Sequence, residues 1–174
     1  LPFAGIRDTP GYLDSPSTTA QFDQPSDALF DSSGNLYLAD TNNHRIRKIT
    51  PSGVVSTYAG QGTPGSTNGT RLESQFNQPR GLAWAPDGSL VIADSGNHLI
   101  RTISPTGIVA TLAGNVGTSG LVDGPATSAT FNSPQDLVYD AEGNLFISDT
   151  FNHAIRKLNT NNDVSVFAGA TQGN

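Results

Sequence analysis

The segment ADTNNHRIRK, residues 39–48, gathers side chains that could carry out chemistry. Asp40 supplies a carboxylate, His44 an imidazole and Arg47 a guanidinium, which are a candidate acid, base and electrophile. The chain has three histidines, and three imidazoles converging on one ion are a known zinc ligand set. The segment therefore raises two hypotheses, a catalytic constellation and a three-histidine zinc site.

The same set of residue types recurs in ADSGNHLIRT, residues 93–102, and in SDTFNHAIRK, residues 148–157. A catalytic set is normally asymmetric, whereas this one is present in every repeat. The structural alternative is that the aspartates accept hydrogen bonds from loop amides or from the arginines, which need such partners when buried, and that the asparagines turn the chain between strands. We favour this structural role and predict no catalytic residue, metal or cofactor for the motif Asp40, Asn43, His44 and Arg47; Asp94, Asn97, His98 and Arg101; Asp149, Asn152, His153 and Arg156.

Other segments repeat in the same phase. FDQP at residues 22–25 matches FNQP at 76–79 and FNSP at 131–134, and an outer segment ending in Ala-Gly closes each unit, with a further copy, PFAG, ending at Gly5. Within each unit, four short apolar runs are separated by turns that contain glycine, which can adopt the positive φ of a hairpin. Repeated units of four antiparallel strands are typical of β-propeller blades.

The repeated run resembles the NHL repeat, named for an Asn-His-Leu signature that Asn97-His98-Leu99 spells literally. The resemblance covers almost the whole chain and implies a propeller, commonly of six blades. Asp27 and Asp136 depart from the family pattern, because they stand where the family has the glycine seen at Gly81. The predicted fold class is all-β, with three NHL-like repeats of about 54–55 residues.

We treat residues 1–174 as one NHL-type segment, with an outer strand and loop of a preceding unit at 1–21 and blades at 22–75, 76–130 and 131–174. Three blades cannot close a ring, and an open half-propeller would expose apolar faces and strand edges, which favours association. Either two chains form a six-bladed homodimer, or the chain is part of a longer protein. The absence of methionine favours a processed or excised chain.

Composition excludes several classes of function. The net charge is -6, and six of the nine basic residues fall inside the recurring segment, so no free-standing basic patch predicts nucleic-acid binding. Without cysteine there is no disulfide, thiolate zinc site or cysteine nucleophile. No apolar run is long enough to span a membrane. The compartment is not fixed by these features, and we expect an extracellular or periplasmic location ahead of others.

Positions where the repeats disagree are more informative about ligands, because the fold does not dictate them. Long loops and the Asn-His turns should lie at one end of each sheet, and long loops on a rigid scaffold usually carry recognition. Gly96 is the small member of the variable turn position. The alternative is that these are tolerant surface sites. The candidate ligand contacts are Ser26, Asp27, Asn42, Arg80, Gln135, Asp136 and Phe151.

Aromatic residues at one phase of the first strand (Phe30, Trp84 and Tyr139) predict packing between blades in preference to a sugar-stacking platform. For function, we favour a non-catalytic binding or assembly module that holds a protein, peptide or glycan on its long-loop face. The alternative, implied by metal-using propeller relatives such as the peptidyl-hydroxyglycine amidating lyases, is a metal-dependent lyase or hydrolase completed by a second half-ring.

Overall fold

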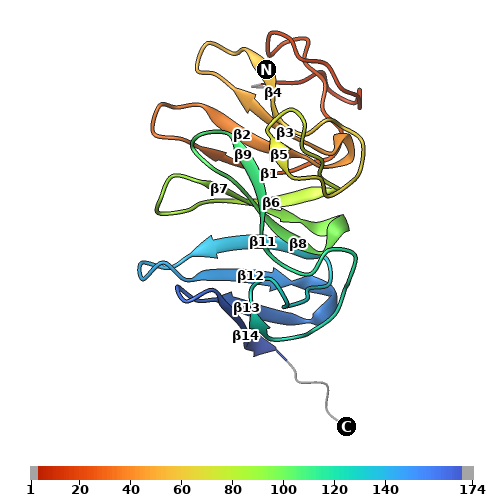
Figure 1. The fold of residues 1–174 in the computed structure, drawn as a ribbon. Coiled ribbons are helices and arrows are strands. Elements are labelled where there is room, and N and C mark those ends of the chain that lie inside the picture. Colours follow the sequence, from red (N-terminus) through yellow and green to blue (C-terminus); the bar gives the residue numbers. More distant parts are fainter. Residues whose placement is uncertain (1–3, 170–174) are drawn as a thin grey trace.

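Three antiparallel sheets follow one another along the chain, from top to bottom in Figure 1. The computed structural model describes residues 4–169. Blade 1 contains β1 (Pro25–Phe30), β2 (Leu36–Asp40), β3 (Arg45–Ile49) and β4 (Val55–Ala59). Blade 2 contains β6 (Pro79–Trp84), β7 (Leu90–Asp94), β8 (Leu99–Ile103) and β9 (Ile108–Ala113). Blade 3 contains β11 (Pro134–Tyr139), β12 (Leu145–Asp149), β13 (Ala154–Leu158) and β14 (Asp163–Gly169). The predicted all-β fold is confirmed.

The hairpin between the first two strands of a blade is set by local side chains. In blade 1, the Asp31 carboxylate accepts hydrogen bonds from the backbone N–H groups of Ser33 and Asn35, both at 2.9 Å. Gly34 then takes a φ of 79°, which glycine adopts without steric cost. Blade 3 repeats this arrangement around Asp140. These contacts lie within five residues, so the turns follow directly from the sequence.

Two sheets contain a fifth strand that the repeat pattern does not predict. β5 (Gly69–Thr70) pairs with β9, and β10 (Gly124–Pro125) pairs with β14. Each long loop therefore runs along the outer edge of the blade that follows it. The expected boundaries 22–75 and 76–130 place β5 and β10 with the preceding blade, whereas both strands pair with the blade that follows.

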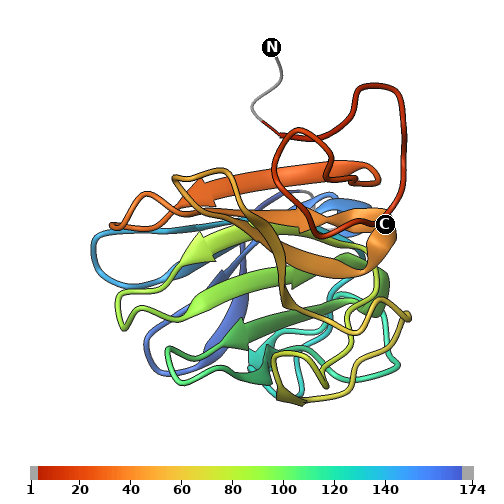
Figure 2. The same cartoon turned by 90° about the horizontal axis from the view of Figure 1, so that it is seen from above.

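The N-terminal segment makes the same contact with blade 1, where Pro16 bridges Val54. Figure 2 shows this red segment looping outward beside the orange strands of blade 1. The expected boundaries place residues 1–21 with a preceding unit, whereas Pro16 of this segment pairs with blade 1. The predicted outer strand PFAG lies partly outside the described residues, and Ala4 and Gly5 form a bend.

The hydrophobic core consists of two clusters at the interfaces that join consecutive blades and a smaller third cluster between blade 1 and Ala20 of the N-terminal segment. The innermost strands β1, β6 and β11 lie next to one another, and apolar residues from both partners fill each interface. Trp84 makes an edge-to-face contact with Tyr37 of blade 1 at 5.1 Å. Tyr139 packs against the core between blades 2 and 3. Phe30 differs, with 60% of its surface exposed, because the described residues contain no blade on that side of blade 1. For this residue the interblade packing stays a prediction.

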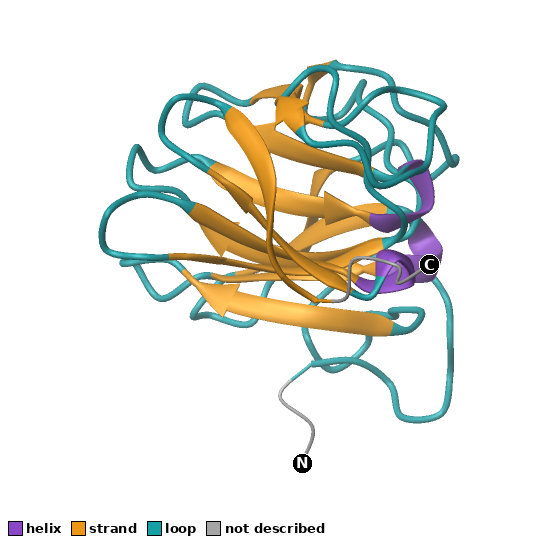
Figure 3. Ribbon diagram, turned by 90° about the horizontal axis from the view of Figure 1, so that it is seen from below, coloured by secondary structure: helices purple, strands orange, loops and turns teal. Residues whose placement is uncertain are grey.

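The two ends of the sheets are chemically different. Short hairpins lie at one end, and three 3₁₀ helices lie at the other beside the long loops: η1 (Thr41–Asn43), η2 (Ser95–Asn97) and η3 (Thr150–Asn152) (Figure 3). Across residues 4–169, none of the helices has the length and apolar character needed to cross a membrane.

Candidate functional site

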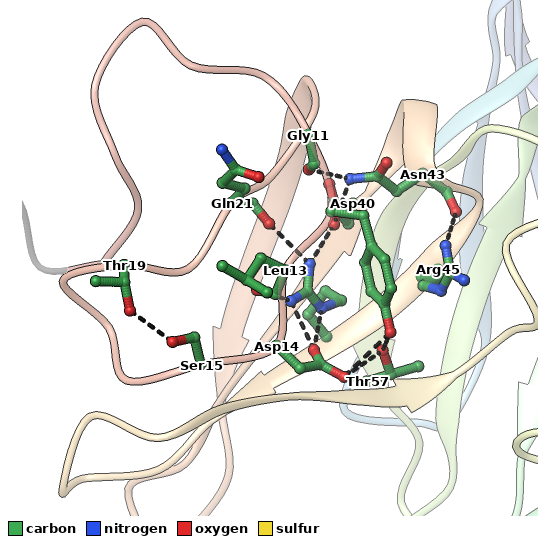
Figure 4. Close-up of polar contacts among 12 residues, drawn as sticks. Gly11, Leu13, Asp14, Ser15, Thr19, Gln21, Asp40, Asn43, Arg45 and Thr57 are labelled. Carbon is green, nitrogen blue, oxygen red and sulfur yellow. Dashed lines mark hydrogen bonds and ion pairs between the residues drawn. The ribbon is translucent and has the colours of Figure 1, made fainter.

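The recurring acidic and basic residues, which were the first candidates for a catalytic role, form a hydrogen-bond network. Figure 4 shows this network around Asp40 and Asn43 of blade 1. The fully buried Asp40 accepts a hydrogen bond through Oδ1 from the Asp23 N–H at 2.8 Å. Its Oδ2 accepts from Asn43 Nδ2 at 2.9 Å and from Arg47 Nη1 at 2.7 Å. Arg47 in turn pairs with Asp14 at 2.7 Å. The Asp40 carboxylate and the Arg47 guanidinium are thus both engaged by other parts of the fold.

The same buried ion pair recurs in the other two blades, although the Nε groups of Arg101 and Arg156 lack the hydrogen bond that Arg47 Nε makes with Asp14. Arg101 pairs with Asp94 and Arg156 with Asp149, both at 2.9 Å, and all four side chains are fully buried. In every blade, the arginine also donates to two carbonyl groups of the long loop, and the asparagine donates to a third: Leu13, Gln21 and Gly11; Thr67, Gln75 and Gly65; Val122, Thr130 and Gly120. The network anchors each long loop to its blade.

The electrostatics of the network follow from its burial. Loss of water around the carboxyl raises the pKa of Asp94 to about 6, although Arg101 and the hydrogen bonds from Asn77 and Asn97 oppose that rise. Burial raises the pKa of Asp40 in the same way, against hydrogen bonds from Asp23, Asn43 and Arg47. Both oxygens of each of these carboxylates accept hydrogen bonds from the chain itself. These contacts hold the fold together.

The histidines connect neighbouring blades. His44 has a φ of 54° at the left-handed end of η1, and its Nδ1 accepts a hydrogen bond from the Gln78 N–H of blade 2 at 3.1 Å. His98 repeats this contact with the Ser133 N–H of blade 3 at 2.9 Å. Burial, with a smaller effect of Arg45, lowers the pKa of His44, which favours the neutral form that can accept. No three His, Cys, Asp or Glu side chains between residues 4 and 169 are placed to hold a metal ion.

A polar hollow of about 380 Å³ lies where the innermost strands begin. Five of the seven predicted ligand contacts line it, although they come from three different blades. Two further lining residues were missed by the sequence analysis. Ser148 could have been found, because the other repeats have Ala39 and Ala93 at its position. The lining residues are Ser26, Asp27, Arg80, Gln135, Asp136, Ser148 and Thr150.

The hollow contains polar groups with remaining capacity to bind. Asp27 uses both oxygens, accepting from the Ala28 N–H at 2.7 Å and from the Leu82 N–H of the next blade at 2.8 Å. Asp136 uses only Oδ1, which accepts from the Leu137 N–H. Within residues 4–169, no hydrogen bond or ion pair engages the guanidinium of Arg80 or the side-chain amide of Gln135. One cation, one amide and one carboxylate oxygen therefore face a shared space.

The other two predicted contacts lie outside this hollow. Asn42 donates through Nδ2 to Asp23 of its own blade at 3.1 Å. Phe151 is 63% exposed on η3, and its N–H donates to the Asn132 carbonyl. Gly96 occupies the same position in blade 2, where an added Cβ would lie 2.6 Å from Asn77 Cγ. This position varies for reasons of local space in blade 2, and its side chains do not join the lining of the hollow.

Comparison with known proteins bears on this arrangement of blades and loops. The family model described as the Teneurin NHL domain matches residues 12–104. The chain belongs to the NHL-repeat family. The NHL chain is 33% identical, over 84% of its length, to the protein Suppressor of quenching 1, chloroplastic, of Arabidopsis thaliana, and 30% identical, over 96% of its length, to NHL repeat-containing protein 2 of Bos taurus. It spans 15% and 25% of these relatives, respectively.

Solved structures show the same blades. A Bacteroides thetaiotaomicron protein of unknown function has a TM-score of 0.73 and 32% identity, with coverage of 82% of this NHL chain and 35% of that chain. An auxiliary nutrient binding protein of the same organism has a TM-score of 0.68 and 28% identity, with coverage of 81% and 37%. Virginiamycin B lyase of Staphylococcus aureus shares the fold alone, at 17% identity and a TM-score of 0.61, with coverage of 86% and 42%. The chain thus corresponds to part of a larger propeller in each case.

Proposed function

We propose that this NHL segment is a non-catalytic binding module that holds a protein, peptide or glycan in the hollow at the start of its innermost strands. The observation that carries the proposal is the convergence of five repeat-variable residues on one hollow. Side chains that differ between otherwise similar repeats are not required for packing, so contact with a ligand can determine which residue stands there. The solved relative named as a nutrient binding protein supports a binding role for propellers of this kind.

The chemistry of the hollow indicates which ligands fit. Arg80 can donate to a carboxylate or to sugar hydroxyls, Asp136 Oδ2 can accept from an amine or hydroxyl, and Gln135 can do both. The hydroxyls of Ser148 and Thr150 add further polar groups to the lining. A ligand that presents both donors and acceptors, as peptide ends and glycans do, satisfies this set.

Glycan and peptide arrays, followed by calorimetry on the tightest ligand, test the proposal. Arg80→Ala and Gln135→Ala should each weaken binding by about 1–3 kcal/mol, because each removes hydrogen bonds to the ligand. Phe151→Ala is the matched control, since Phe151 lies at the same end of the sheets but outside the hollow, and it should bind as the unmodified chain does. Unchanged binding by both hollow variants would refute the proposal.

We also propose that the module completes its ring by self-association. Within the described residues, neither the outward face of blade 3 nor that of blade 1 packs against another blade, although part of the blade 1 face is covered by the N-terminal segment. Burying both faces would extend the interblade cores already present.

The alternative, a metal-dependent lyase or hydrolase, stays a prediction. Zinc or calcium that remains bound stoichiometrically after dialysis would favour the lyase or hydrolase over the binding module.

A further inference from the structure

Each interface between blades is built from two sets of buried apolar residues, one from each blade, which we call half-cores. In the interface between blades 2 and 3, blade 2 contributes the leading half-core and blade 3 the following half-core. The interface between blades 1 and 2 uses the corresponding positions. The leading half-core of blade 2 comprises Ala83, Val91, Ala93, Ile100 and Ala113, and the following half-core of blade 3 includes Phe131, Leu137, Leu145, Ile147, Leu158 and Val164.

Blade 3 presents another leading half-core on its free face. Val138 is 62% exposed and Ile155 37% exposed, whereas their repeat counterparts Ala83 and Ile100 are 7% and 0% exposed. Phe167, also exposed on this face, packs edge-to-face on Phe146 at 4.8 Å. This surface therefore has the apolar character of an interblade interface.

Blade 1 carries a following half-core on the side away from blade 2, where Leu38, Ile49 and Val55 are already buried together with Ala20 of the N-terminal segment. Phe22, Ala28, Leu36, Leu38, Ile49 and Val55 stand at the positions of the following half-core of blade 3. Phe22 is half-buried and Ala28 exposed, whereas the counterparts Phe131 and Leu137 are buried. The two ends of the chain thus carry the two complementary halves of one interface.

The polar contacts of an interface are also divided between the two ends. In the two formed interfaces, a histidine Nδ1 accepts from the N–H of a residue with φ of 52° or 53°. Gln24 on blade 1 already has the corresponding φ of 51°. It lines a hollow of about 940 Å³ beside the free face of blade 1. Within residues 4–169, neither His153 Nδ1 nor the Gln24 N–H has a hydrogen-bond partner.

Gly5 makes a hydrogen bond that, in blades 2 and 3, comes from the glycine after the outer strand of the preceding blade. The Gly5 N–H donates to the Ser17 carbonyl at 2.8 Å, as Gly60 donates to Arg71 and Gly114 to Ala126 at the same distance. Gly60 and Gly114 each directly follow the outer strand of the blade before the loop that receives them. Ala4–Gly5 thus occupies the place where the outer strand of a preceding blade would end.

We propose that a second copy of this chain docks head to tail, with its blade 3 face on the blade 1 face of the first copy. In the complex, His153 Nδ1 of one copy accepts from the Gln24 N–H of the other, and Ala168–Gly169 displaces Ala4–Gly5. Two such junctions close a ring, since each copy carries both halves. The inference rests on the self-association proposed above. It adds which two faces meet, the head-to-tail direction in which they meet, and the segment, Ala4–Gly5, that competes with the second copy.

Sedimentation velocity on the full chain tests the docking, with an expected mass of twice the 18.1 kDa of one chain. Ile155→Asp and Ala28→Asp each place a charge on one of the two faces, on an exposed side chain that leaves the blade intact, and each variant alone should be monomeric. Mixing the two variants should restore a dimer through the one junction that remains intact. Leu72→Asp, on an exposed residue outside both faces, should remain dimeric.

A chain that begins at Ile6 should dimerise at least tenfold more tightly, because the competing segment is gone. A monomeric full chain with an equally monomeric shortened chain would overturn the proposal. A dimer that survives Ile155→Asp, or a mixture of the two variants that stays monomeric, would overturn it as well. Calorimetry with the array-selected ligand is scored separately, so loss of ligand binding by Arg80→Ala in a chain that still dimerises as expected bears on the hollow alone.

Discussion

At the scale of single residues, the histidines show how a repeated side chain can serve the contacts between blades. His44 adopts a positive φ at the left-handed end of η1, and its Nδ1 accepts a hydrogen bond from the Gln78 N–H of blade 2. An imidazolium cannot accept at that nitrogen, so protonation removes the contact. The repeat therefore contains a pH-sensitive junction where a catalytic base was one hypothesis.

The contribution of His44 to stability should fall as the pH drops below the unfolded histidine pKa of 6.5, because the pKa of His44 is lower in the fold. The unfolded chain binds the proton first, so this contribution is present above pH 6.5, declines as the pH falls toward the folded pKa, and levels off below it. His44→Asn should flatten this decline, since asparagine tolerates positive φ and its Oδ1 can accept. Urea denaturation at several pH values measures both slopes, and equal slopes would contradict the assignment.

The buried ion pairs predict a larger effect on stability. Asp94→Asn leaves the guanidinium of Arg101 buried without its counter-charge, which should cost about 3–5 kcal/mol of unfolding free energy. Arg80→Leu is the matched control, because that arginine forms no ion pair within residues 4–169, and it should change stability by less than about 0.5 kcal/mol. Urea denaturation of the two variants at neutral pH compares the effects, and a loss below about 1 kcal/mol for Asp94→Asn would show that the pair is not needed.

At the scale of strands, the spacing of the innermost strands depends on one glycine. A Cβ on Gly81 would lie 2.6 Å from Asp136 Cα and 2.7 Å from the Gln135 carbonyl oxygen. Those atoms belong to the backbone of β11 and cannot rotate away. Residue size at this position therefore sets how closely β6 approaches β11.

Gly81→Ala should destabilise the chain by about 1–3 kcal/mol, the usual cost of overpacking. The control is Asp136→Ala, which places the same residue at the same repeat position of blade 3, where the side chain is exposed. Thermal unfolding followed by circular dichroism measures both variants, and an equal change in the two would rule out close approach as the cause.

At the scale of the whole molecule, the repeat position occupied by Asp27, Gly81 and Asp136 differs between junctions. Each of the two formed junctions has one aspartate at this position, and the proposed junction would have two. Asp27 accepts a hydrogen bond from the Leu82 N–H of blade 2, and Gly81 faces Asp136 of blade 3. Head-to-tail docking would instead set Asp136 against Asp27 of the second copy. The proposed junction therefore carries both added bulk and like charge at this point.

Asp136→Gly should make dimerisation about 1 kcal/mol more favourable, because like charges at close range are destabilising. Asp136→Asn removes the charge and keeps the size, so the two variants separate the effects. Glu142→Gln, a charge change on the distant hairpin, should leave the dimer unchanged. Sedimentation equilibrium gives the three constants, and weaker association of Asp136→Gly would contradict this geometry.

The sequence by itself determined the strands, the hairpins and the recurring motif of Asp40 and Arg47. These depend on apolar alternation and on contacts within one repeat, which recur three times and therefore stand out. It also identified Arg80 and Gln135 as positions the fold does not dictate.

Only the tertiary structure decided what lies between repeats. β5 is two residues long, too short for any periodicity to reveal, and it forms because an edge of β9 is available to it. The exposure of Phe30 depends on whether a neighbouring blade is present. The shared hollow of Ser26, Arg80 and Gln135 likewise exists because three inner strands meet, and that meeting is set by packing across residues more than fifty positions apart.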